Sequence, residues 1–568
     1  MEKIKLFFSC VGSNTDQNKG TILSLLILNF FTIAWQNIHT YGNSQLKVLL
    51  LDFIFLLAAV LLLILVINLT PKRRVKLFIF RLLIAISLIL AIFECFSIYS
   101  YQALVGAGII AAILGTNIHE AHEFFKMYVG LKGIAALVMT AAIAFFISKA
   151  WHLIPRFRVR CKSLAGAAIT VVILSGAISG IVIWRDFHSF VVNDMLDIPL
   201  VRITRSVFIA ANNIKALEEL AEKTNNTVEI TVNNSDVPYI VFILGEATNR
   251  DRMHLYGYPL ENTPNLDELA KNNEIAVFRD TISSQGATIA SLREMLTFHD
   301  AESEDEWYNY NNLIDVMKQA GYKTYWLSNQ ESSGIWGNVA QLFASRSDVK
   351  QFTQLRESHE DSGRLDEELF PLLDAALQKG AAKNFYILHL MGGHGLYYMR
   401  FPYIFTKFKA NDIPPPQNNY SEEKRTEIAQ YENALFYNDW IVSSLIGKLA
   451  DREAIVIYLP DHGETVYDND SNFAGHVEEN PNRQQLEVPF IIWGSPSYRK
   501  KQSKTWQKIL ASTNRPYMTD DIIHTIMDIA KIETSEFTPS KSIINDNFNA
   551  ARIRMVRGKN YDTELKDK

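Results

Sequence analysis

Residues 238–250 have the sequence PYIVFILGEATNR, a continuous apolar run followed by a glycine and an acid. Apolar residues at both odd and even positions are typical of a strand that is buried on both faces. Similar runs recur farther along the chain, at residues 276–282, 323–327, 384–390, 454–459 and 488–493. Segments with helical periodicity lie between them, at residues 313–320, 365–377 and 424–449. Strands that alternate with helices predict an α/β/α sandwich, in which a largely parallel sheet is covered on both sides.

Polar side chains come directly after these predicted strands. In chain order they are Glu246, the hydroxyl-bearing segment 283–288, Asn329, His394, Asp461 and His462. Because sites in such folds gather at the carboxyl ends of the strands, we expect these groups to lie together. A single histidine or acid is usually structural, but the whole set predicts metal-assisted attack by an oxygen nucleophile. His476 follows in a polar loop, where a site role and an exposed loop position fit equally well.

The first third of the chain has a different composition from the rest. The mean hydropathy of the 568 residues is +0.01, a value between those of soluble enzymes and of transporters. A membrane-crossing helix needs about 20 mostly apolar residues. Segments of about this kind cover residues 22–38, 48–67, 77–99, 133–148 and 164–184. We therefore predict a transmembrane anchor with five spans over residues 1–185.

Basic residues indicate the orientation of this anchor. They cluster before the first span, between the second and third, and between the fourth and fifth, whereas the alternate loops carry few. Since positive charge stays on the cytoplasmic side, the N-terminus is predicted to be cytoplasmic and the C-terminal domain to lie outside. Residues 186–236 are predicted to form a connector, with an interfacial helix at 203–221 and a loop at 224–236. Residues 237–568 then form the catalytic domain.

The net charge and the cysteines limit the function further. The formal net charge is −5 and the isoelectric point is about 6.3, which argues against nucleic-acid binding as the main function. The 3 cysteines are Cys10, Cys95 and Cys161. All of them precede the predicted catalytic domain, so that domain cannot contain an internal disulfide.

Several motifs carry a resemblance to a known family. They are GEATNR at 245–250, LYGY at 255–258, TPNL at 263–266, GYKTYWLSNQ at 321–330 and PDHGE at 460–464. Together they resemble the phosphoethanolamine transferases of the alkaline phosphatase and sulfatase superfamily. The resemblance covers essentially the whole chain, because that family also has five N-terminal spans and a periplasmic catalytic domain. It implies a multi-pass protein of the bacterial inner membrane.

The resemblance also implies roles for individual residues. Zinc would be bound by Glu246, Asp461, His462 and Thr288, and Thr288 would also be the nucleophile. His394 and His476 match histidines that bind the transferred phosphate or a second metal ion, so one zinc site is expected and a second is left open. Asn329 would lie near the headgroup. The segment that approaches the donor lipid would contain Thr116, Asn117 and Glu120.

Two features of the sequence depart from common members of that family. Thr288 lies in QGATIASL at 285–292, without the flanking cysteine of many members, and other hydroxyls lie nearby at Thr281, Ser284 and Ser291. The absence of cysteines from the catalytic domain resembles a cysteine-poor branch that modifies the lipopolysaccharide core or other envelope glycans.

The implied reaction is transfer of phosphoethanolamine from phosphatidylethanolamine to an envelope glycan, either lipopolysaccharide core or lipid A. It would proceed through a covalent phosphoethanolamine–threonine intermediate and release diacylglycerol. One alternative is a phosphoglycerol transferase of the lipoteichoic-acid-synthase type, which would use phosphatidylglycerol and manganese. Another is a catalytically inactive envelope scaffold, for which bound zinc is the discriminating observation. No sulfatase is expected, because the chain lacks the Cys/Ser-x-Pro-x-Arg context at this position.

Overall fold

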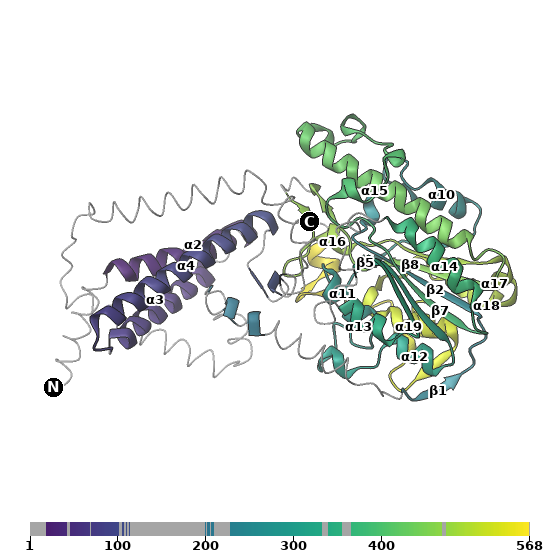
Figure 1. Cartoon of the computed structure of the whole chain (residues 1–568), viewed down its shortest axis with the longest axis horizontal. Helices are drawn as coiled ribbons and strands as arrows, with labels where there is room; N and C mark the ends of the chain where they lie inside the picture. Colours follow the sequence, from purple (N-terminus) through teal and green to yellow (C-terminus); the bar gives the residue numbers. More distant parts are fainter. Residues whose placement is uncertain are drawn as a thin grey trace. The chain divides into compact units, whose positions relative to one another are not determined.

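The structure is a computed structural model, and it divides the chain into two compact units (Figure 1). It describes residues 19–41, 46–68, 70–101, 228–331, 339–354, 365–468 and 473–566, together with a few residues between 105 and 208. Residues 19–101 belong to one unit and residues 228–566 to the other.

Three long apolar helices lie in the described residues of the N-terminal unit. They are α2 (Lys19–Tyr41), α3 (Leu46–Asn68) and α4 (Arg73–Tyr101). Their bounds enclose the first three predicted spans. Within the described residues, α4 alone contains a segment, Arg73–Ile98, that is long and apolar enough to cross a membrane. The fourth and fifth predicted spans lie outside the described residues, so the count of five stays a prediction.

A buried ion pair stabilises this unit. Glu94 of α4 is fully buried, and its carboxylate pairs with the guanidinium of Arg202. Arg202 also donates from Nε to the carbonyl oxygen of Val105, at 3.2 Å. An acid within an apolar helix is costly unless it is paired, and Arg202 supplies that partner.

The second unit is built on a seven-stranded sheet with the order β3-β11-β8-β2-β7-β5-β6. Its strands are β2 (Tyr239–Gly245), β3 (Ile275–Phe278), β5 (Lys323–Glu331), β6 (Val349–Gln354), β7 (Asn384–His389), β8 (Ala454–Pro460) and β11 (Phe490–Gly494). Neighbouring strands pair in parallel except at β11, which is antiparallel to both β3 and β8. The predicted, largely parallel sheet is therefore confirmed, with one strand reversed.

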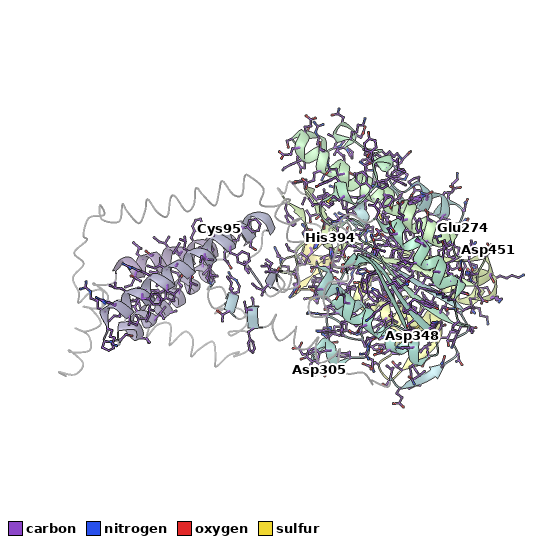
Figure 2. The ribbon with its side chains drawn as sticks, in the orientation of Figure 1. Cys95, Glu274, Asp305, Asp348, His394 and Asp451 are labelled. Atoms are coloured by element: carbon purple, nitrogen blue, oxygen red, sulfur yellow. The ribbon has the colours of Figure 1, made fainter. Side chains whose placement is uncertain are left out.

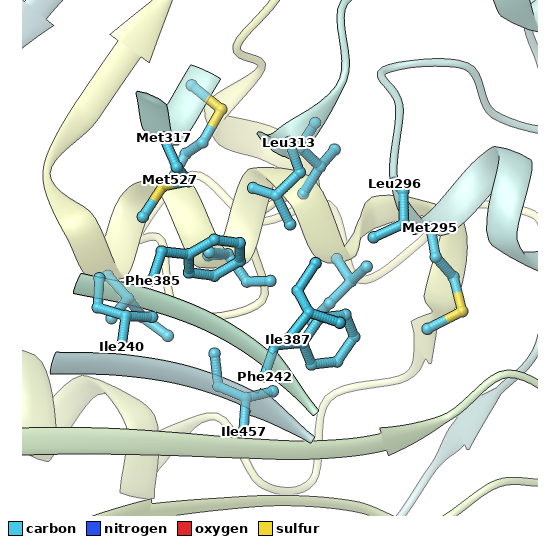
Figure 3. Close-up of a cluster of buried hydrophobic side chains, with 14 of the residues drawn as sticks. Ile240, Phe242, Met295, Leu296, Leu313, Met317, Phe385, Ile387, Ile457 and Met527 are labelled. Atoms are coloured by element: carbon cyan, nitrogen blue, oxygen red, sulfur yellow. The ribbon is translucent and has the colours of Figure 1, made fainter. Parts of the chain in front are cut away.

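Alternate residues of the central strands face two separate apolar layers. In β2, Phe242 packs into one cluster and Ile243 into the other. The Phe242 layer includes side chains of α11 (Thr288–Met295), α12 (Leu313–Gln319), α13 (Val339–Arg346), α18 (Ser503–Ala511) and α19 (Ile522–Ala530). Figure 3 shows this layer, where Met295 and Leu313 lie over Phe242 and Ile387. The Ile243 layer includes side chains of α10 (Pro264–Lys271), α14 (Leu369–Gln378) and α15 (Glu422–Gly447). Helices thus cover both faces of the sheet (Figure 1), as the alternating pattern predicted.

Local sequence signals account for the ends of two covering helices. Ser421 caps α15, since its hydroxyl accepts from the Lys424 N–H at 3.4 Å. Pro264 starts α10, where proline is tolerated because the first helical N–H has no partner within the helix. The Asp439 carboxylate of α15 accepts from the Leu266 N–H at 2.8 Å, so one helix caps the other.

Two sequence predictions are wrong, and one strand was missed. The run 276–282 is not one strand: it divides into β3, in the main sheet, and β4 (Thr281–Ile282), which pairs in parallel with β12 (Tyr517–Met518). The strand β6 was not predicted at all. The predicted loop 224–236 contains β1 (Ile230–Asn233), which pairs with β13 (Ile532–Thr534). This pairing joins residues 230–233 to the unit predicted to begin at 237.

The remaining elements are short. They are β9 (Thr465–Val466), β10 (Ala474–Gly475), α16 (Arg483–Leu486), α17 (Pro496–Lys501), β14 (Met555–Val556) and β15 (Lys559–Asn560). Figure 2 shows His394, which follows β7, at one end of the sheet and Asp451, which precedes β8, at the other. The polar residues that follow the parallel strands therefore lie at the end marked by His394.

Candidate active site

Thr288, Glu246 and His462 meet at the carboxyl ends of the strands. Thr288 is the first residue of α11, Glu246 follows β2, and His462 follows β8. The Thr288 hydroxyl donates to Glu246 Oε1 at 3.1 Å and lies 3.2 Å from His462 Nε2. His462 Nε2 in turn lies 3.2 Å from Glu246 Oε1. A hydroxyl, a carboxylate and an imidazole thus converge on one point, although 174 residues separate Thr288 from His462.

Asp461 adds a second carboxylate to this group. Its Oδ1 accepts from the backbone N–H of His462 at 2.8 Å and of Ala247 at 3.3 Å. Its Oδ2 is buried, lies 3.5 Å from His462 Nε2 and makes no hydrogen bond. A buried carboxylate oxygen without a partner is costly, and coordination of a cation removes that cost.

The donor set fits a zinc ion. One ligand atom each from Glu246, His462 and His476 lies within 4.8 Å of the others. Carboxylate oxygen and imidazole nitrogen are ordinary zinc ligands, and Asp461 Oδ2 offers a further oxygen beside them. The backbone orients His462, because its Nδ1 lies 2.7 Å from the carbonyl oxygen of Gly463 and Nε2 is left to face Thr288.

The electrostatics of this group favour a positive charge at its centre. Burial by itself lowers the pKa of His462, but Asp461 and Glu246 outweigh burial and raise it to about 10. The pKa of Asp461 rises to about 6, because of its burial and the nearby Glu246. The two acids therefore stabilise a cation between them, whether a proton on the imidazole or a metal ion.

A further acid lies behind His476. Glu464 is fully buried, and its Oε2 lies 2.7 Å from His476 Nδ1, while its Oε1 accepts from the Tyr397 hydroxyl at 2.8 Å. Burial of the Glu464 carboxyl raises its pKa to about 8. Burial of the His476 ring, together with the nearby His462, lowers the pKa of His476 to about 3. The contact with Nδ1 leaves Nε2 as the nitrogen of His476 that can serve the site.

His394 approaches the same group from the loop after β7. Its ring centroid lies 5.8 Å from that of His476, which lies 4.0 Å from that of His462. The loop passes directly over the residues after β2: a Cβ on Gly392 would lie only 2.5 Å from the Glu246 carbonyl oxygen, and Gly392 has a φ of +50°. Glycine is therefore required there for the loop to bring His394 to the site.

Asn329 is buried and bonds to Asp366 and Thr353. Its Nδ2 donates to Asp366 Oδ1 at 2.8 Å, and its Oδ1 accepts from the Thr353 hydroxyl at 2.5 Å. The same Asp366 carboxylate accepts from the backbone N–H of Met391, at 2.8 Å, and of Gly392. These contacts support the loop that leads to His394, and a role for Asn329 near the headgroup stays a prediction.

The neighbour Gln330 contacts the site, and the sequence analysis did not single it out. Its Nε2 donates to Glu246 Oε2 at 3.2 Å and to the carbonyl oxygen of Leu390 at 3.1 Å. Successive residues of a strand point to opposite faces, so the period of two could have indicated that only one of Asn329 and Gln330 reaches Glu246. Glu464 was likewise not assigned a role, although it belongs to the PDHGE motif.

The other hydroxyls near Thr288 have different contacts. The Ser291 hydroxyl donates to the carbonyl oxygen of Gln285 at 3.3 Å, and the Thr281 hydroxyl is buried without a hydrogen bond. The backbone N–H of Ser284 bonds to the Thr519 hydroxyl. Of these candidates, Thr288 is the one hydrogen-bonded to Glu246. The predicted donor-lipid residues, Thr116, Asn117 and Glu120, lie outside the described residues.

Comparisons with known proteins show the family to which the chain belongs. The sulfatase family model matches residues 238–532, more than half of the chain. The phosphoethanolamine transferase EptC of Escherichia coli K12 is 29% identical over 470 residues, which cover 78% of each chain.

Two solved structures are also similar. The periplasmic domain of Escherichia coli EptC in complex with zinc is 30% identical, with a TM-score of 0.55, over 59% of this chain and 96% of that one. The integral membrane protein lipooligosaccharide phosphoethanolamine transferase A of Neisseria meningitidis shares the fold, with a TM-score of 0.63 at 21% identity over 92% of this chain and 98% of that one. The chain therefore belongs to the sulfatase family, and phosphoethanolamine transferases are among its relatives.

Proposed function

We propose that this protein transfers phosphoethanolamine from phosphatidylethanolamine to an envelope glycan, with Thr288 as the nucleophile. The observation that carries the proposal is the position of the Thr288 hydroxyl, 3.1 Å from Glu246 Oε1 and 3.2 Å from His462 Nε2. A nucleophile needs such contacts, since an alcohol at its ordinary pKa attacks phosphorus poorly. The transferase names of the relatives support the same reaction.

Zinc is the cofactor in this proposal, held by Glu246, Asp461, His462 and Thr288. When bound, zinc would stabilise the deprotonated Thr288 hydroxyl and the negative charge of the phosphoryl group. Asp461 Oδ2, which is buried and makes no hydrogen bond, supports this assignment, as does the zinc complex of the EptC domain.

The first half-reaction exchanges one bond for another. A bond forms between Thr288 Oγ1 and the donor phosphorus, and the bond from phosphorus to the diacylglycerol oxygen breaks. The proton that leaves Thr288 balances the proton that the diacylglycerol oxygen takes up. His476 lies beside His462, and His394 lies beside His476, so in this proposal the two histidines would hold the phosphoryl oxygens.

The second half-reaction regenerates the enzyme. A hydroxyl or a protonated phosphate oxygen of the acceptor glycan attacks the same phosphorus, and the bond from phosphorus to Thr288 Oγ1 breaks. The proton that leaves the acceptor oxygen balances the proton that Oγ1 takes up. Lipopolysaccharide core or lipid A is the acceptor in this proposal.

The proposal includes the five-span anchor, with a cytoplasmic N-terminus and a periplasmic catalytic domain in a bacterial inner membrane. The helices α2, α3 and α4 and the similarity in fold to a full-length integral membrane protein support it. The segment with Thr116, Asn117 and Glu120 would approach the donor lipid. An anchor gives this reaction a physical advantage, because tethering raises the effective concentration of a substrate that itself lies in the bilayer.

The test uses the purified full-length protein and phosphatidylethanolamine with a labelled headgroup. Diacylglycerol release and label on the protein are measured for the wild type, for Thr288→Ala and for Ser291→Ala, a matched loss of a nearby hydroxyl. The wild type and Ser291→Ala are expected to release diacylglycerol and to carry the covalent label. Thr288→Ala is expected to do neither. Activity that persists in Thr288→Ala would reject Thr288 as the nucleophile. Activity on phosphatidylglycerol instead would reject phosphatidylethanolamine as the donor. No activity on either lipid, together with no bound zinc, would favour an inactive scaffold.

A further inference from the structure

Two adjacent apolar side chains of the catalytic unit project into solvent. Tyr403 is 89% exposed and Ile404 is 86% exposed, the largest values among the exposed large hydrophobic residues in the described part of the chain. They lie in a short 3-10 turn, Tyr403–Phe405. We call these two residues the 403–404 turn.

The 403–404 turn is anchored to the fold and is not a loose loop. Phe405 packs its ring against Tyr437 and Trp440 of α15, with centroid separations of 4.8 and 5.3 Å. The backbone N–H of Phe405 donates to the Pro402 carbonyl oxygen at 2.8 Å. The fold therefore holds the two apolar side chains outward at a defined position, where exposure to water is unfavourable.

The surrounding segment has the composition of a membrane–water interface. Residues 396–411, LYYMRFPYIFTKFKAN, contain the basic residues Arg400, Lys407 and Lys409 and no acidic residue. Lys407 and Lys409 are exposed. Aromatic side chains are enriched at the headgroup level of membranes, and basic side chains there are attracted to anionic lipids.

A bilayer fits this surface better than a protein partner does. A specific protein interface buries about 800 Å² on each partner, more than two side chains can supply. Shallow insertion into a bilayer needs only a few apolar side chains with basic residues beside them. The same chain also contains α4, whose segment Arg73–Ile98 is long and apolar enough to cross a membrane.

We propose that the 403–404 turn inserts into the interfacial region of the lipid bilayer. The insertion would also position the active site, a consequence that rests on the proposed function. Arg400 Nε donates to the carbonyl oxygens of His394, at 2.5 Å, and Gly395, at 3.0 Å. Because this contact ties the segment to the backbone of His394, a docked turn holds the His394 loop at the level of the lipid headgroups.

Site-directed spin labelling of the full-length protein in vesicles tests the insertion. The three cysteines are first replaced (Cys10→Ser, Cys95→Ser, Cys161→Ser), and single labels are then introduced by Tyr403→Cys or Ile404→Cys. The matched control is Ile553→Cys, at another exposed apolar position of the same unit, where the side chain is 60% exposed. The vesicles contain phosphatidylethanolamine and phosphatidylglycerol, and the accessibility of each label to oxygen and to a water-soluble nickel complex is compared.

Insertion predicts a several-fold higher ratio of oxygen to nickel accessibility at positions 403 and 404 than at 553, since oxygen concentrates in lipid and the nickel complex stays in water. A ratio at 403 and 404 equal to that at 553 would overturn the proposal. Shielding from both reagents would also overturn it, because it would place the turn against protein.

A kinetic comparison tests the consequence for the active site. The double variant Tyr403→Ser/Ile404→Ser should raise KM for phosphatidylethanolamine in vesicles several-fold and leave turnover of a soluble short-chain analogue unchanged, while Ile553→Ser should change neither. Equal loss with both substrates would contradict the positioning role. If the wild type releases no diacylglycerol, the proposed function fails, and the spin-label result still decides whether the turn inserts.

Discussion

Glu464 Oε2 lies 2.7 Å from His476 Nδ1, and this contact orients the ring of His476 toward the ligand cluster. The Tyr397 hydroxyl holds the other carboxylate oxygen at 2.8 Å, so both oxygens of a fully buried acid are used. Carboxylates that support an imidazole in this way fix which nitrogen is available to a metal ion or a phosphate.

Replacing Glu464 should therefore impair the site without unfolding the domain. We expect Glu464→Leu to lower turnover or zinc affinity by about 10- to 100-fold, as is typical for loss of such a supporting partner. Glu464→Gln should retain part of the function, because its amide oxygen still accepts from Nδ1–H. Tyr397→Phe, which leaves the contact to His476 intact, is the control. Diacylglycerol release and zinc competition titrations measure the effect, and equal behaviour of Leu and Gln at position 464 would contradict it.

Gln330 and Asn329 should respond in opposite ways to the same substitution. Gln330→Leu removes the donor to Glu246 Oε2 and should weaken zinc binding about 10-fold with little change in stability. Asn329→Leu leaves the Asp366 carboxylate short of a donor and should destabilise the domain by about 1–3 kcal/mol, with zinc affinity of the folded protein retained. Zinc titration and thermal unfolding separate the two, and loss of zinc affinity only in Asn329→Leu would reverse the assignment.

Gly392 should not tolerate a side chain. In Gly392→Ala the new Cβ would lie 2.5 Å from the Glu246 carbonyl oxygen at a φ of +50°, so the loop must move. We expect a loss of about 1–3 kcal/mol of stability, together with reduced diacylglycerol release. Gly447→Ala is the control, because Gly447 ends α15 and its Cβ would meet nothing within 4 Å. The Gly447→Ala change should stabilise the domain by up to about 1 kcal/mol, because alanine has a higher helix propensity than glycine. Unfolding midpoints of both variants provide the comparison.

His524 should make the catalytic unit sensitive to acid. Its side chain is 2% exposed, and its Nδ1 accepts from the Thr538 N–H at 3.2 Å, which requires a neutral ring. Burial, with the nearby Lys541 cation, lowers the pKa of His524 to about 3 from an ordinary 6.5, although Asp300 opposes the shift.

Between these two pKa values the unfolded chain binds a proton that the folded chain does not, so stability falls as the pH drops below about 6.5. The loss amounts to about 2 kcal/mol at pH 5. His524→Gln keeps a hydrogen-bond acceptor at this position but has no titrating group. Between pH 7.5 and pH 5 the variant should therefore lose about 2 kcal/mol less stability than the wild type. Unfolding curves at the two pH values test this, and parallel losses in wild type and variant would show that other groups are responsible.

The central strands could be predicted from the sequence because burial on both faces requires a continuous run of apolar residues. Residues 238–244, 385–388 and 454–459 are apolar throughout, and they lie in or overlap β2, β7 and β8. The edge strand β6 has the sequence VKQFTQ, and its polar residues interrupt any such run. Its strand character comes from parallel pairing with β5, a contact that no short window of sequence contains.

The sequence by itself determined which chemical groups follow the strands: the acid at 246, the Asp461–His462 pair and the hydroxyl at 288. Only the tertiary structure decided which of them touch. It placed Gln330, and not Asn329, against Glu246, and it set Glu464 behind His476. It also reversed β11 between β3 and β8. The physical reason is the separation along the chain over which each feature is set. Strand propensity and polarity depend on neighbouring residues, whereas contacts between segments far apart in the chain depend on the order in which the strands pair.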